Sequence, residues 1–398
     1  MPSVVHHYVP QWYQERFFEP GQREQKFFYL DKHPDTVTAP NGKTYTRNDV
    51  LRWGTPRCFQ EEHLYSARFG KAVSDLIERQ FFGRIDDVGS NALPLIAEYR
   101  LENDLNEAWQ GFMHFMGAQK QRTPKTLDLI ALILASRGIK PTQNNVMRAM
   151  RDSWQVFHTA WTEAVWEIVH ASQSDIKFIV SDDPVTVYNY KAFPNNSKWK
   201  YPFDPPVGLV ASQTLYPLDR EHCLILTNLD YARNPDRDPL KMRLNYRVFE
   251  QTMFKMMDVQ TRRELSRVEV ATINYILKTR ARRYIAAAKR EWLYPETLLS
   301  TLHWSKLGGF LLPNPNLMGF GTAIIVGYED KRKNFAIDEY GYHPSEANKL
   351  RDRRRANDFV ALEKRRDPNG PAVMHAQDLW LPNGGLSRKR KASSKKDP

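Results

Sequence analysis

The chain has 398 residues, 41% of them hydrophobic and 12% aromatic, which is enough for the core of one large domain or two ordinary ones. The net charge is +12, and the two cysteines, Cys58 and Cys223, lack the Cys-x-x-Cys spacing of a zinc ribbon and are too few for a disulfide scaffold. Because no secretory leader pattern and no 18-residue apolar run is visible, we expect no membrane partner and a cytoplasmic location.

A short aromatic helix is predicted close to the N-terminus, directly after two histidines. Its apolar residues have the i, i+3, i+4, i+8 spacing of one helix face: Val9, Trp12, Tyr13 and Phe17. Pro10 suits the first helical position, where the missing N–H costs nothing. His6 and His7 would then lie just before a helix N-terminus, whose partial positive charge disfavours the imidazolium. A neutral imidazole there can act as a base, a metal ligand or a hydrogen-bonding partner.

The rest of the N-terminal half is predicted to be mainly helical. A strand over residues 26–30 is followed by a hairpin whose turn is Asn41-Gly42. Helices are predicted over residues 65–82, 105–122 and 143–171, with a break at residues 86–89. Thr123 and Pro124 have the residue types of a helix cap and a first helical position, so they predict a further helix start.

The second half has the apolar runs of a sheet. Four strands, which we interpret as parts of one antiparallel sheet, are predicted over residues 176–180, 185–188, 207–218 and 223–227. A long helix is predicted over residues 264–292, and Asn274 lies in its apolar stripe. A buried asparagine must be hydrogen-bonded, so Asn274 should have a specific partner. A further strand is predicted over residues 320–328.

These elements predict an α+β fold, in which a helical N-terminal half is packed on a central, mostly antiparallel sheet and followed by a long closing helix and a basic C-terminal extension. The predicted boundaries are an α+β domain over residues 1–292, a partly ordered extension over 293–383 and a disordered basic tail over 384–398, which has almost nothing to bury.

Most of the positive charge lies at the C-terminal end. Residues 331–398 contain 17 lysines and arginines and 9 acidic residues, so they hold +8 of the net charge. A basic excess of this kind attracts nucleic acid, although a solvated surface with a disordered tail explains it equally well. The candidate nucleic-acid contacts form two clusters, Arg351, Arg353, Arg354 and Arg355, and then Arg388, Lys389, Arg390 and Lys391.

Several patches, in order along the chain, resemble the family called domain of unknown function 4238. They are His6-His7-Tyr8-Val9-Pro10-Gln11 followed by Trp12, Tyr13 and Phe17; Gln121-Arg122-Thr123-Pro124; Ser181-Asp182-Asp183-Pro184-Val185; and Asn274 with the later pair Arg283-Tyr284. The resemblance covers about residues 4–290. It implies no established activity, and it indicates only where a site lies.

The candidate catalytic residues are two histidines and two aspartates. The run from His6 is similar to the first strand of the His-Asn-His nucleases, in which one histidine binds a metal and its neighbour activates water. In the alternative interpretation, His6 and His7 attach the N-terminus to the sheet. Asp182 and Asp183 follow a strand, so one of them faces the site if the backbone is extended, whereas Ser-Asp-Asp-Pro is also good turn chemistry.

Three further side chains are candidate binding residues. Arg16 and Arg122 could each clamp a phosphate or a carboxylate, or form a structural ion pair. Asn274 could bind a ligand or connect the core by hydrogen bonds. Two functions follow: a metal-assisted phosphodiesterase or nuclease that uses a divalent metal, or a non-catalytic protein that binds nucleic acid or another partner. If the first is right, His6 or His7 should lie within one-water reach of Asp182 or Asp183.

Overall fold

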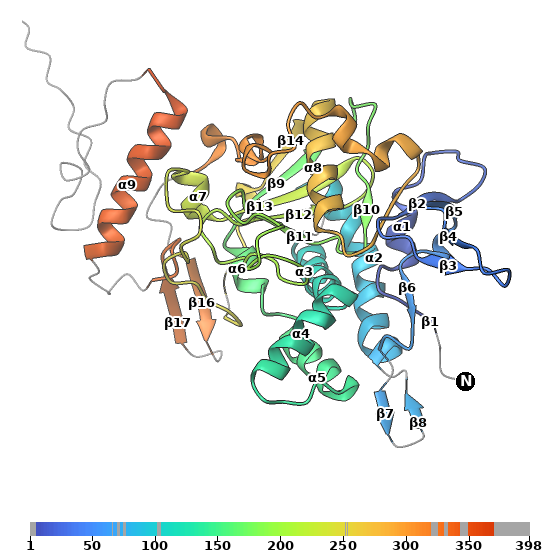
Figure 1. The fold of residues 1–398 in the computed structure, drawn as a ribbon. Helices are drawn as coiled ribbons and strands as arrows, with labels where there is room; N and C mark the ends of the chain where they lie inside the picture. The colour runs from blue at the N-terminus through green and yellow to red at the C-terminus, as the bar shows by residue number, and fades with distance from the viewer. Residues whose placement is uncertain are drawn as a thin grey trace, which may run out of the picture.

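The computed structural model describes residues 5–65, 67–69, 72–74, 77–101, 105–250, 252, 254–319, 325–329, 333–342 and 349–369. In the view of Figure 1, the larger sheet lies in the middle of the molecule, with the helices of residues 105–153 below it and the helix Arg267–Arg280 (α8) above it. The predicted α+β class is confirmed, because helices and mostly antiparallel strands share one continuous core. In the described part of the chain, no helix is long and apolar enough to cross a membrane.

The larger sheet has five strands in the order β11-β12-β13-β9-β14. Their bounds are Thr186–Tyr188 (β11), Gln213–Pro217 (β12), His222–Thr227 (β13), Val165–His170 (β9) and Gln260–Glu264 (β14). All neighbours are antiparallel except β14, which runs parallel to β9. A turn at residues 219–221 joins β12 to β13. Every residue of β12 is buried, which identifies it as an inner strand.

The smaller sheet has four antiparallel strands in the order β10-β15-β2-β5. They are Val180–Ser181 (β10), Tyr284–Ala287 (β15), Phe27–Asp31 (β2) and Val50–Trp53 (β5). Three further pairs of strands form separate two-stranded sheets: Val5–His7 (β1) with Gln60–Glu62 (β6), Thr36–Thr38 (β3) with Thr44–Thr46 (β4), and Ala67–Phe69 (β7) with Ala72–Ser74 (β8). The Asn41-Gly42 hairpin is therefore confirmed, and Gly42 has the positive φ of 79° that its turn requires.

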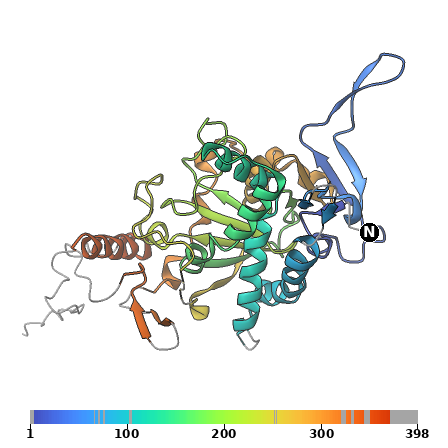
Figure 2. The same cartoon turned by 90° about the horizontal axis from the view of Figure 1, so that it is seen from below.

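The helices form two groups. The N-terminal group comprises Gln11–Glu15 (α1), Gly83–Glu98 (α2), Leu105–Gln121 (α3), Pro124–Ser136 (α4), Gln143–Ser153 (α5) and His158–Thr162 (α6). The later group comprises Leu229–Arg233 (α7), Arg267–Arg280 (α8) and Lys349–Arg366 (α9), and the pair Ile325–Glu329 (β16) and Lys333–Ile337 (β17) precedes α9. Figure 2 shows α9 at the far end of the molecule from the N-terminus.

The predicted helix over residues 65–82 is wrong. That stretch contains β7, β8 and a π-helix, Ile77–Phe82, and α2 runs straight through residues 86–89, where a break was predicted. Gly89 explains the second error, because a Cβ there would lie 2.6 Å from the Phe115 ring of α3. The glycine allows two helices to approach closely rather than ending one.

Two other predicted helices are too long. The one over residues 143–171 ends at Ser153 and is replaced from Val165 by β9, and the one over 264–292 ends at Arg280 and is replaced from Tyr284 by β15. The strands predicted over residues 176–180 and 207–218 are shorter, since only β10 and β12 pair. The core also continues past residue 292, because Trp304, Leu307 and Leu311 belong to the same buried cluster.

Candidate functional site

The two N-terminal histidines lie in a strand, β1, and not directly before the helix as predicted. His6 is completely buried, and its Nδ1 accepts a hydrogen bond from the Tyr65 backbone N–H at 2.9 Å. The two rings are stacked with centroids 5.5 Å apart. This contact fits the interpretation in which His6 attaches the N-terminal strand to the body of the protein.

His7 is partly buried beside the short helix at residues 55–57. Burial lowers the pKa of His7, although its contacts with the backbone of Pro56 and Thr55 act in the opposite direction. Its Nε2 atom is buried and has no hydrogen-bond partner among the described residues. A neutral imidazole with one unused nitrogen is what a base or a ligand needs, and it is also compatible with a packed core residue.

Asp182 is a buried carboxylate that binds the backbone. Its two oxygens accept hydrogen bonds from the N–H groups of Arg282, Arg283 and Tyr284 at 2.7, 2.6 and 2.7 Å. Burial raises the pKa of Asp182, and the three N–H donors oppose this because they stabilise the ionised form. The carboxylate therefore holds the bend at which α8 turns into β15.

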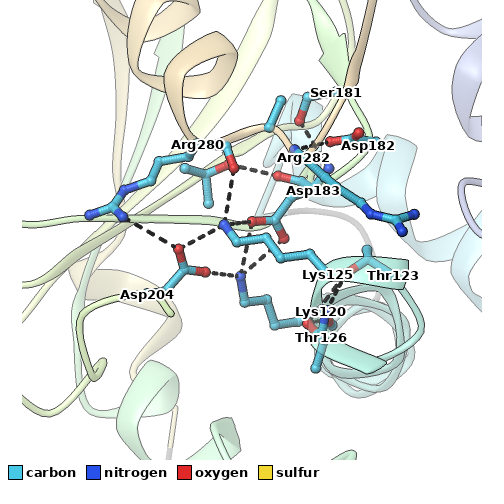
Figure 3. Close-up of polar contacts among 12 residues, drawn as sticks. Lys120, Thr123, Lys125, Thr126, Ser181, Asp182, Asp183, Asp204, Arg280 and Arg282 are labelled. Atoms are coloured by element: carbon cyan, nitrogen blue, oxygen red, sulfur yellow. Dashed lines mark hydrogen bonds and ion pairs between the residues drawn. The ribbon is translucent and has the colours of Figure 1, made fainter. Parts of the chain in front are cut away.

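Asp183, the next residue, points toward the helices. We use the term buried charge cluster for Lys120, Lys125, Asp183, Asp204 and Arg280 (Figure 3). Asp183 accepts from Lys120 Nζ at 3.1 Å and from Lys125 Nζ at 2.7 Å. Asp204 joins the same two ammonium groups at 2.9 and 2.7 Å. The neighbouring aspartates thus face different partners, as expected for extended backbone.

The charges of the cluster stabilise one another. Burial opposes the charged form of Lys120, but Asp183 and Asp204 outweigh it, so that the pKa of Lys120 is raised. Burial also opposes the charged form of Asp204, yet Lys120 and Lys125 hold its pKa well below the usual range. Sequence reasoning missed Lys120, Lys125, Asp204 and Arg280. The available signal was a pair of lysines flanking the Gln121–Pro124 patch.

The three predicted binding residues use their hydrogen-bonding groups within the chain. Arg122 binds Asp86 at 2.9 Å and the Gln119 side chain at 2.6 Å, and Arg16 binds Asp219 at 2.9 Å. Asn274 accepts from the N–H of Ile179 and donates to the carbonyl of Lys177. The expected specific partner of Asn274 is therefore found, in the strand-like segment before β10.

The histidines and the aspartates do not form a hydrogen-bonded pair. Within the described ranges, neither Asp182 nor Asp183 hydrogen-bonds to a histidine, and their oxygens are taken by the groups named above. No cluster of three or more His, Cys, Asp or Glu side chains placed to hold a metal ion is found in the part of the chain that the structure describes.

A cavity of about 750 Å³ lies beside the Asp182 bend. We call it the basic cavity, because six cationic side chains and only two carboxylates, Glu61 and Asp128, line it. The cations are Lys32, Lys125, Lys200, Arg280, Arg282 and Arg283. Aromatic side chains complete the wall: Tyr8, Trp199, Tyr201, Phe203 and Tyr284. Its volume is in the range typical of small-molecule sites.

The cations of the basic cavity are not equally neutralised. Arg283 pairs with Asp31 at 2.7 Å, and Lys125 belongs to the buried charge cluster. Arg282 is half-exposed and lies 3.3 Å from Glu61 and 3.6 Å from Asp128. Lys32 and Lys200 have no carboxylate partner among the described residues. The cavity therefore presents positive charge that the chain itself leaves uncompensated.

Two of the patches quoted from the sequence contribute side chains to the wall of this cavity. Tyr8 belongs to the first patch, and Arg283 and Tyr284 belong to the last one. Asp182, from a third patch, holds the bend at residues 282–284. A family described as "Protein of unknown function (DUF4238)" matches residues 5–291. The chain belongs to the DUF4238 family. No curated protein and no solved structure matches it.

Membership of the DUF4238 family assigns no chemistry, so the site has to be interpreted from its geometry. The matched segment ends at residue 291, just after β15, and it contains every residue that lines the basic cavity. The family patches thus contribute side chains to the cavity wall and also support it from behind. Arg122 donates to the Gln119 side chain, which in turn donates to the carbonyl of Tyr8.

Proposed function

We propose that the basic cavity binds a phosphate-bearing ligand of about the size of a nucleotide. The observation that carries this proposal is the excess of cations over carboxylates among the lining side chains. Arginine and lysine are the usual partners of phosphate oxygens, because their hydrogen bonds to an anion are charge-assisted. Carboxylates behind the wall cancel only part of this excess. Lys125 is paired with Asp183 and Asp204, and Arg283 is paired with Asp31, but Lys32 and Lys200 have no carboxylate partner among the described residues.

The aromatic side chains support a ligand with a planar ring. Tyr201 and Phe203 are 45% and 40% exposed, which is unusual for large aromatic residues and leaves their faces accessible at the cavity. Stacking on exposed aromatics combined with a basic groove is how many proteins bind single-stranded nucleic acid and nucleotides. A free nucleotide, or the terminal nucleotide of a strand, has both the phosphate and the planar ring.

Calorimetric titration with AMP and with adenosine tests the proposal. AMP should bind and adenosine should not, and Arg282→Ala and Lys200→Ala should each weaken AMP binding by about tenfold, because a charge-assisted bond is lost. Lys140→Ala, which removes an exposed lysine between α4 and α5, is the matched control and should bind like the unmodified chain. Equal binding of AMP and adenosine would contradict the proposal.

The metal-assisted phosphodiesterase centred on His6, His7, Asp182 and Asp183 remains a prediction. It requires Asp182 to release the N–H groups of residues 282–284, and Asp183 to release Lys120 and Lys125, before either carboxylate can bind a metal. The non-catalytic alternative requires no such change and agrees better with the contacts of the site. A cytoplasmic location likewise stays a prediction.

Nucleic-acid binding by the C-terminal basic run is a second proposal, on a different surface. Arg353 is exposed on α9, whereas Arg355 pairs with Glu339 at 3.0 Å. The Arg351 side chain and the cluster Arg388, Lys389, Arg390 and Lys391 lie outside the described residues. Of the described arginines in the predicted run, Arg353 is therefore the one best placed to contact a phosphate backbone.

A further inference from the structure

Lys32 differs from the other cations of the basic cavity. It directly follows β2, and its backbone N–H donates to the carbonyl of Arg283 at 2.8 Å. Its side-chain Nζ donates to the carbonyl of Ala281 at 2.7 Å, and it has no carboxylate partner in the described part of the chain. The amine is thus fixed in place by a neutral group.

The surroundings of Lys32 favour the uncharged amine. Burial lowers the pKa of Lys32 to about 8; the carboxylate of Asp182 opposes this, and Lys125 and Lys278 add to it. At pH 7.5 about a quarter of such an amine is unprotonated, compared with about a thousandth for an ordinary lysine. Desolvation together with neighbouring cations is a recognised way to activate a lysine nucleophile.

We infer that Lys32 is a nucleophile in the basic cavity that forms a Schiff base with an aldehyde carrying a phosphate group. That the aldehyde also carries a phosphate group rests on the proposed function, in which Arg282 and Lys200 bind the phosphate. The aldehyde is chosen as the electrophile because a neutral lysine condenses reversibly with a carbonyl group and needs no other reactant.

The reaction balances without an oxidant or a metal. The Nζ lone pair attacks the aldehyde carbon, forming the C–N bond and breaking the C=O π bond to give a carbinolamine. The carbinolamine oxygen leaves as water with the two protons of the amine, which yields the neutral imine. The imine then takes one proton from the solvent, and that N–H can donate to the Ala281 carbonyl as the amine does now. Asp182 would stabilise the resulting cation.

Trapping with cyanoborohydride tests the inference on the full chain. The probes are ribose 5-phosphate and an oligonucleotide with one abasic site, which both carry an aldehyde and a phosphate group. The first represents a free sugar phosphate, and the second represents damaged DNA. Reduction should leave a stable mass increase on the Lys32 peptide for at least one probe, and the more efficient probe identifies the source. The trapping rate should rise several-fold between pH 6.5 and 8.

Two variants and an inert analogue decide the outcome. Lys32→Arg keeps the positive charge and should abolish the adduct at this position, whereas Lys140→Arg, at an exposed lysine outside the cavity, should retain it. Because peptide mapping of the unmodified chain locates the adduct without any variant, a folding defect of Lys32→Arg does not obscure the result. Adducts spread over exposed lysines such as Lys140, or none on Lys32, would overturn the inference.

Binding of ribitol 5-phosphate, which has no aldehyde, is measured in parallel. If ribitol 5-phosphate binds and no adduct forms on Lys32, the nucleophile is refuted while the phosphate site stands. If an adduct forms on Lys32 and ribitol 5-phosphate does not bind, the phosphate site is refuted and the reactive lysine stands.

Discussion

Asp182 illustrates how a single carboxylate can support a site without touching a ligand. Ser181-Asp182-Asp183-Pro184 is compatible with a turn, a cap or a catalytic pair when only its sequence is considered. In the structure, the three backbone N–H groups that Asp182 binds belong to residues 282–284, a hundred positions later. The sequence around Asp182 does not indicate this long-range contact, so the role of Asp182 could not be predicted.

We predict that Asp182→Asn lowers the free energy of unfolding by at least about 3 kcal/mol, because a buried amide oxygen replaces a carboxylate that satisfies three donors. Urea denaturation measures the loss. Asp236→Asn, at an exposed aspartate, is the control and should change the stability by less than about 0.5 kcal/mol. Similar stabilities of the two variants would show that Asp182 does not hold the bend.

His158 should make stability depend on pH. Burial lowers the pKa of His158 to about 4, with His114 contributing, and its Nε2 has no hydrogen-bond partner among the described residues. An unfolded histidine titrates near 6.5. Between pH 6.5 and 4 the unfolded chain therefore binds a proton that the folded chain does not. Stability is constant above this window and falls as the pH decreases through it, by at most about 3 kcal/mol.

The variant His158→Gln tests this dependence. Unfolding free energies at pH 7.5 and 4.5 should differ less in the variant than in the unmodified chain, because the titrating group is gone. His33→Gln, at an exposed histidine, should leave the difference unchanged. If His158→Gln retains the full difference, another group is responsible.

At the scale of elements, the junction of α3 and α4 was predicted well. The cap Thr123 accepts from the Thr126 N–H and Pro124 begins α4, as its sequence indicates. The core face of α3 is likewise visible in the sequence, because Phe112, Met113 and Met116 recur at helical spacing, and all three are buried. That Lys120 and Lys125, on either side of the junction, would meet Asp183 and Asp204 was not predictable, since the partners lie 58 to 84 positions away.

Two of the errors concern inner strands. Both β9 and β15 are mostly buried, and short apolar runs of this kind have no period that separates a strand from a continuing helix. Trp161 and Val165 even keep a helical spacing, although α6 ends at Thr162. Pairing with β13 and β14 determines β9, and pairing with β10 and β2 determines β15. These contacts are long-range and override local propensity.

The variant Asp204→Asn should loosen one wall of the basic cavity. It leaves Lys120 and Lys125 with a single carboxylate, and breaking a buried ion pair on one side typically costs about 3–5 kcal/mol. The segment around Trp199–Phe203, which lines the cavity, should lose protection in hydrogen exchange first. Asp152→Asn, at an exposed aspartate of α5 away from the cavity, is the control. Unchanged protection around residues 196–206 would assign Asp204 no role in this wall.

At the scale of the whole molecule, α9 is attached to the body by buried charges as well as by apolar contacts. Asp358 is completely buried, and it accepts from Arg237 Nε at 3.0 Å and from the Tyr340 hydroxyl at 2.7 Å. Leu362 packs against Ala232 and Met318. The face of α9 that carries the predicted basic run is therefore partly used for docking, which a count of charges along the sequence does not indicate.

This attachment sharpens the test of nucleic-acid binding by the C-terminal segment. Replacing Arg353, Arg354 and Arg355 together would also remove the Arg355–Glu339 pair and disturb α9. The single variant Arg353→Ala avoids this.

If α9 contacts a phosphate backbone, Arg353→Ala should weaken the binding of a mixed-sequence duplex and reduce the slope of log K against log salt by about one, because one counterion fewer is released. Fluorescence anisotropy at several salt concentrations measures both quantities. A truncation after Gly384 removes Arg388 to Lys391 together with Lys395 and Lys396, and it should reduce the slope by up to about five if the tail also binds. Arg151→Ala, at an exposed arginine of α5, is the control with the same change of charge. Equal affinities and slopes in all four proteins would assign the C-terminal charge to a solvated surface, and the basic cavity would then be the remaining candidate for contact with nucleic acid.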